Sequence, residues 1–62
     1  FVVKKFFPVE VLSVLGMFLG HISLYNTDMQ LIKRSLKEAG YANGVYILRS
    51  KGLHMNHRVQ LR

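Results

Sequence analysis

The chain has 62 residues, no cysteine and a formal net charge of +6 at pH 7. Without cysteine it has no disulfide and no thiolate zinc site, and a domain this small buries only about 60% of the surface of its unfolded chain. Half of the residues are hydrophobic, so we expect partner molecules to cover apolar surface and the chain not to be a free monomer. The positive charge favours a polyanionic partner, such as RNA, DNA or an anionic membrane.

The most hydrophobic stretch of the sequence runs from Phe6 to Tyr25. Its apolar residues share one broad face at helical spacing, which predicts a core helix over about Val9–Leu19, starting just after Pro8. Twenty residues would also just cross a bilayer, so a membrane span is the alternative. Glu10 and His21 count against that alternative because ionisable groups are costly in hydrocarbon. We therefore favour the core helix and expect no membrane partner.

Two further elements follow along the chain. His21–Tyr25 alternates polar and apolar residues, which predicts a short strand. Thr27 and Gln30 have the spacing of a capping box, in which side chains satisfy unpaired backbone N–H groups. The sequence predicts a helix over Asp28–Ala39 with an apolar stripe on one side, ended by Gly40.

The last third of the chain predicts a β-hairpin. Val45–Leu48 is rich in strand-forming residues, and Leu53–Arg62 alternates apolar and polar side chains. The turn between them falls at Lys51 and Gly52. The predicted fold class is α+β in two layers, ordered helix, short strand, helix and antiparallel hairpin (α-β-α-β-β).

No residue pattern indicates catalysis. A metal site needs three or four converging ligands, and His54 and His57 lie on opposite faces of the predicted strand. The three carboxylates fall on different elements, so no pair is available for acid–base catalysis. We predict no enzyme activity, no catalytic or metal-binding residue and no cofactor.

The basic residues suggest a phosphate-binding surface. Lys33, Arg34 and Lys37 share the polar side of the predicted second helix, and Lys51 and Arg58 belong to the hairpin. Such residues position a nucleic-acid backbone without reading its sequence. An ordinary solvated helix face is the alternative interpretation.

Two motifs and the predicted element order carry a family resemblance. Glu10–Leu15 resembles the acidic-hydrophobic-Leu-Ser pattern, and Leu36–Tyr41 the Leu-Lys-Glu-x-Gly-aromatic helix ending, of the small-ribosomal-subunit protein eight family. The resemblance covers the family's amino-terminal half and implies a structural ribosomal component that binds rRNA and neighbouring ribosomal proteins. It places rRNA contacts at Ser13, Asn26 and Thr27.

The same resemblance bears on domain organisation and location. We expect residues 1–62 to be a single small domain or the amino-terminal half of a larger ribosomal protein, because the family's serine- and glycine-rich rRNA-binding loop has no counterpart here. A reduced member would suit an organellar, for example mitochondrial, ribosome; a cytoplasmic location is the alternative.

Two other functions stay open. One is a single-pass accessory subunit of a mitochondrial membrane complex, with Phe6–Tyr25 as its span. The other is a small winged-helix-like DNA-binding regulator, with Asp28–Ala39 as recognition helix and the hairpin as wing. A winged helix normally has another helix before the recognition helix, and the spacer between Gly20 and Asn26 leaves no room for one.

Overall fold

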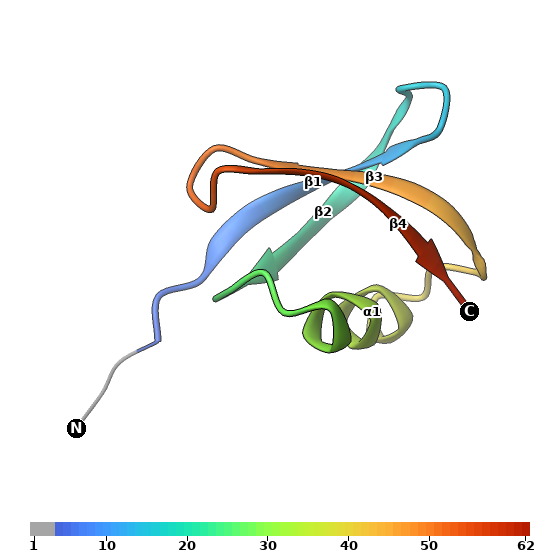
Figure 1. Cartoon of the computed structure of the whole chain (residues 1–62). Coiled ribbons are helices and arrows are strands. Elements are labelled where there is room, and N and C mark those ends of the chain that lie inside the picture. The colour runs from blue at the N-terminus through green and yellow to red at the C-terminus, as the bar shows by residue number, and fades with distance from the viewer. Residues whose placement is uncertain (1–3) are drawn as a thin grey trace.

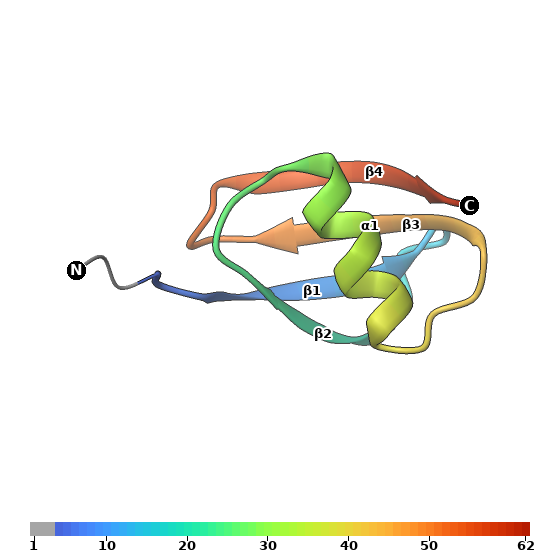
Figure 2. The same cartoon turned by 90° about the horizontal axis from the view of Figure 1, so that it is seen from below.

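The computed structural model describes residues 4–62, which form one four-stranded antiparallel sheet and one helix. The elements in chain order are β1 (Phe7–Ser13), β2 (Phe18–Leu24), α1 (Met29–Glu38), β3 (Gly44–Ser50) and β4 (Met55–Leu61). The strands lie in the order β2-β1-β3-β4. Helix α1 lies under one face of the sheet (Figure 1) and crosses it from the side of β4 towards β2 (Figure 2). The other face has no helix over it.

The predicted order α-β-α-β-β, with two helices, is wrong. The expected helix over Val9–Leu19 is instead β1, a turn and the start of β2. Val9 and Val11 are fully buried while Glu10 between them is only half-buried, a period of two that the helical reading overlooked. Gly16 has a φ of +85°, which ends any regular helix there. A short apolar run is compatible with both the helical period of 3.6 and the strand period of two. The pairing of β1 with β2 and β3 decides for the strand.

The membrane span and the winged helix, the two alternatives considered from the sequence, also bear on this region and on the number of helices. Residues 6–25 form most of a hairpin instead of one continuous helix. Within residues 4–62, no helix combines the length and the hydrophobicity that a membrane crossing needs. A winged helix needs several helices, and α1 is the only one in the described part of the chain, so residues 4–62 do not have that architecture.

The helix is predicted within a residue or so at each end, but its cap differs. Asp28, with an extended backbone, is the N-cap, and its carboxylate accepts a hydrogen bond from the Gln30 N–H at 2.8 Å. The sequence predicted Thr27 in this role. After Ala39 the chain turns at Gly40, whose φ of +90° favours glycine. Asn26 and Asp28 therefore stabilise the start of α1 through their side-chain hydrogen bonds.

The core lies between the sheet and α1. Its buried members come from every strand and from the helix: Val9, Val11, Ile22, Leu24, Ile32, Leu36, Leu48, Met55, Val59 and Leu61. The alternation predicted for β4 is confirmed at Met55, Val59 and Leu61, while His57, in phase with them, stays exposed. On the opposite face of the sheet, Leu12 is also buried, at 6% exposed, while most other side chains there are exposed or half-buried.

Candidate nucleic-acid interface

The sheet face away from α1, called the open face below, collects side chains from all four strands. Successive side chains of a strand point to opposite faces, and directly paired residues share a face. The pairing registers therefore assign twelve described residues to the open face: Pro8, Glu10, Leu12, Phe18, His21, Ser23, Val45, Ile47, Arg49, Asn56, Arg58 and Gln60. The face is thus mixed, with apolar, aromatic, amide and guanidinium groups side by side.

Two rows of four side chains cross this face from β2 to β4. One row consists of Phe18, Leu12, Ile47 and Arg58, and the other of His21, Glu10, Arg49 and Asn56. Phe18 and His21 also pack edge to face, with ring centroids 4.8 Å apart. The first row is therefore apolar from β2 to β3 and ends in Arg58 on β4, while the second row is polar throughout.

The charge on the open face is mainly positive. Arg49 donates from Nη2 to Oε2 of Glu10 at 3.2 Å, and both side chains are substantially exposed. Glu10 is the only carboxylate on this face within residues 4–62, because the other two acidic residues, Asp28 and Glu38, belong to the cap and the last turn of α1. Arg58 has no carboxylate beside it in its row.

Strand β4 presents a regular series of hydrogen-bonding side chains. Asn56, Arg58 and Gln60 alternate with buried or inward positions and are exposed. Arg62, just after the strand, donates from Nη2 to Oε1 of Gln60 at 3.4 Å, so its guanidinium joins the series. Asn, Gln and Arg are the residue types that make bidentate hydrogen bonds to base edges in duplex DNA.

The basic residues predicted from the sequence divide between two sides of the molecule. Arg58 lies on the open face, and Lys51 is exposed in the β3–β4 turn. Lys33, Arg34 and Lys37 lie on α1, where Ile32 and Leu36 face the core, so they belong to the other side of the sheet. Arg34 pairs there with Glu38 at 3.5 Å. The structure does not bring the helix cations and the hairpin cations together.

The three positions that the family resemblance places against rRNA are also separated. Ser13 lies at the tip of the β1–β2 hairpin, where its Oγ accepts hydrogen bonds from the N–H groups of Leu15 and Met17. Asn26 and Thr27 follow β2 at the other end of that hairpin, and the Asn26 side-chain Oδ1 accepts from the Asp28 N–H at 2.9 Å. Ser13 and Asn26 therefore stabilise two different turns.

Sequence reasoning missed Arg49, Asn56 and Gln60 as members of one site. The alternation in Leu53–Arg62 had already placed Asn56 and Gln60 on the polar side of a strand. What it lacked was the sheet order, which places β3 between β4 and the β1–β2 hairpin and so brings Arg49 beside Asn56. Arg49, Asn56 and Gln60 share one face because β3 lies between β1 and β4 in the sheet.

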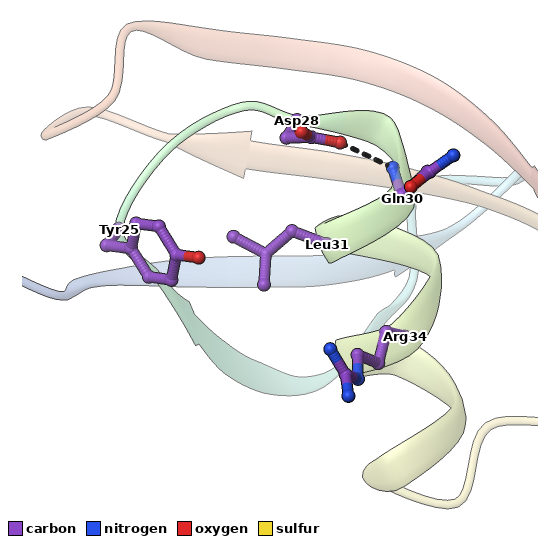
Figure 3. A pocket seen from close by; sticks show the side chains of 5 residues that line it. All are labelled: Tyr25, Asp28, Gln30, Leu31 and Arg34. Carbon is purple, nitrogen blue, oxygen red and sulfur yellow. Dashed lines mark hydrogen bonds between the residues drawn. The ribbon is translucent and has the colours of Figure 1, made fainter.

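A hollow of about 280 Å³ lies beside the first turns of α1. It is lined by Tyr25, Asp28, Gln30, Leu31 and Arg34 (Figure 3). The Asp28 carboxylate already caps the helix, and Arg34 pairs with Glu38, so both charged lining residues are engaged. Across residues 4–62, no three His, Asp or Glu side chains converge as metal ligands would.

We compared the sequence and the structure with known proteins and found no match. No protein-family model matches the sequence, and the curated proteins and the solved structures likewise contain no match to it. The candidate interface therefore depends on the geometry of this chain.

Proposed function

We propose that this chain binds nucleic acid with the open face of its sheet, and that duplex DNA is the form this face suits best. The observation that carries the proposal is the exposed series Asn56, Arg58 and Gln60 on β4, extended by Arg62. It sits on a sheet face that no helix of residues 4–62 covers. A net charge of +6 on 62 residues favours binding, because cationic side chains release counterions condensed on the phosphates.

The side-chain types favour reading of base edges. Arginine makes bidentate hydrogen bonds to guanine, and asparagine and glutamine make them to adenine, in the major groove of B-DNA. That groove is about 12 Å wide and admits a two-stranded β-ribbon. Strands β3 and β4 form such a ribbon, with Arg49, Asn56 and Arg58 on its open side. Side chains on one face of a strand follow each other at about 6.8 Å, which is about twice the 3.4 Å rise of one base pair.

The same face suits RNA less well. Sequence-specific proteins for single-stranded RNA stack unpaired bases on aromatic rings. Within residues 4–62, the open face has only two aromatic rings, Phe18 and His21, and they already pack against each other. The major groove of A-form RNA is too deep and narrow for side chains to read. Duplex DNA is the better match.

A ribosomal function stays a prediction and is the second candidate. Its support is the Leu36–Tyr41 motif, which does end a helix with a glycine turn as the resemblance implies. It uses Ser13, Asn26 and Thr27, the cations along α1, and also Lys51 and Arg58 of the hairpin, whereas the DNA proposal uses only β3 and β4. The two candidates therefore differ in the effect expected of substitutions on α1, and both expect Arg58 to matter.

The test first selects a preferred short duplex from a random DNA pool. Fluorescence anisotropy then compares that duplex with its two single strands and with small-subunit rRNA fragments at the same salt concentration. We expect the duplex DNA to bind tightest. Arg58→Ala should weaken it by about five- to 150-fold, the range for one bidentate base contact, while Lys37→Ala, an equal charge loss on α1, has a much smaller effect.

The opposite pattern would support the ribosomal candidate. If rRNA binds more tightly than duplex DNA and Lys37→Ala weakens binding more than Arg58→Ala, the DNA proposal is wrong. If neither nucleic acid binds at moderate salt, both candidates are wrong.

A further inference from the structure

The tip of the β1–β2 hairpin is an exposed apolar surface. Its large hydrophobic side chains are Val14, Leu15, Met17, Phe18 and Leu19, and Leu15 is 85% exposed. The chain has no charged residue between Glu10 and His21. A group of apolar side chains of this kind, on a small basic module, normally marks an interaction site.

The backbone of the tip is already largely hydrogen-bonded within itself. The Ser13 N–H donates to the Met17 carbonyl at 2.8 Å, and the Gly16 N–H donates to the Ser13 carbonyl at 2.9 Å. The Ser13 Oγ accepts from the N–H groups of Leu15 at 3.3 Å and Met17 at 3.1 Å. The N–H groups of Ser13, Leu15, Gly16 and Met17 thus have partners within the turn, which lowers the cost of moving them out of water.

The tip is continuous with the open face. Figure 1 shows the β1–β2 hairpin rising away from α1 towards its tip. Phe18 pairs with Leu12, which pairs with Ile47, which in turn pairs with Arg58. An apolar path therefore leads from the tip across the sheet to the proposed base-reading strand.

We propose that this tip inserts between stacked base pairs of a DNA duplex held on the open face. The inference rests on the proposed function. Proteins that kink DNA place Phe, Leu, Ile or Met side chains between base steps and partly unstack them, and Leu15, Met17 and Phe18 are of this type. A polyanion complements the arginines that lie on the same face, and an apolar side chain at the end of a hairpin is thin enough to enter one opened step.

The test uses the 62-residue chain and the selected duplex, with 2-aminopurine substituted at one adenine at a time. We expect bound wild-type protein to raise the fluorescence at one step only, because 2-aminopurine brightens when it is unstacked. Leu15→Ser and Met17→Ser should remove that rise at saturating protein. Met29→Ser, which changes a similarly exposed methionine on α1, should preserve it. Energy transfer between dyes on the duplex ends should report a bend that the two tip variants lose.

The possible failures are distinguishable. If the wild type binds the duplex, Arg58→Ala weakens it and no step brightens, the insertion is overturned while DNA binding stands. If the duplex does not bind at all, the proposed function itself fails. The insertion is also overturned if the tip variants keep the fluorescence rise but lose self-association in sedimentation, or lose binding to phosphatidylserine vesicles, because the tip then serves a second copy or a membrane.

Discussion

Arg49 and Glu10 form an ion pair across neighbouring strands in the middle of the open face, with Nη2 and Oε2 3.2 Å apart. Both side chains are substantially exposed to solvent, so the pair adds at most about 1 kcal/mol to stability. Its larger consequence concerns ligands. The Glu10 carboxylate binds the Arg49 guanidinium, which would otherwise be free to contact a phosphate or a base. Its negative charge also repels an approaching polyanion.

Glu10→Gln should therefore increase affinity for duplex DNA. The substitution removes the one acidic group on the open face of residues 4–62 and frees Arg49. We expect the log–log dependence of affinity on salt to steepen by about one unit, as for one additional phosphate contact. Anisotropy titrations over a series of salt concentrations measure both effects. Glu38→Gln is the matched control, since it breaks an ion pair with Arg34 on α1; an equal gain there would contradict the open-face interface.

Asp28→Ala should destabilise the fold more than Thr27→Ala. The Asp28 carboxylate accepts from the Gln30 N–H at 2.8 Å and caps α1. Replacing such a cap by alanine costs about 0.5–2 kcal/mol in the free energy of unfolding. Urea denaturation followed by circular dichroism measures the difference. A larger loss for Thr27→Ala would show that the capping box predicted from the sequence operates instead.

Gly16→Ala should destabilise the hairpin through its backbone alone. Gly16 has a φ of +85°, and a Cβ placed there meets no atom within 4 Å. The expected cost is therefore conformational, about 1–2 kcal/mol for a residue with a side chain in left-handed geometry. Gly44→Ala is the control, because its Cβ would make only ordinary contacts with Tyr46. Equal denaturation midpoints for the two variants would contradict the turn described for Ser13–Met17.

Leu48→Ala should have the largest effect on stability. Leu48 is fully buried on β3, where it pairs with Val11 and His57. Truncating a core leucine costs about 2–5 kcal/mol, a large share of the stability of a chain this short. Leu15→Ala, at the exposed tip, should leave the thermal midpoint nearly unchanged. If the tip variant were as destabilised as the core variant, the hairpin tip would be packed and not exposed.

The carboxy-terminal part of this chain was predictable because its signals are local. Asp28 and Gly40 bracket an amphipathic segment, and the alternation in Leu53–Arg62 leaves one strand phase. The amino-terminal part was not. Its apolar residues satisfy both a helical stripe and a strand alternation, and only the antiparallel pairing of β1 with β2 and β3 decides between them.

The candidate site divides in the same way. The sequence by itself determined the strong positive charge, the polar face of β4 including Arg58, and the cations along α1, because these follow from composition and from the period of one element. Only the tertiary structure decided that Glu10 and Arg49 meet, that Phe18 shares a row with Arg58, and that α1 carries Lys33 and Lys37 to the other side. The physical reason is that a sheet face is made by neighbours distant in the chain, and hydrogen-bonded register chooses those neighbours.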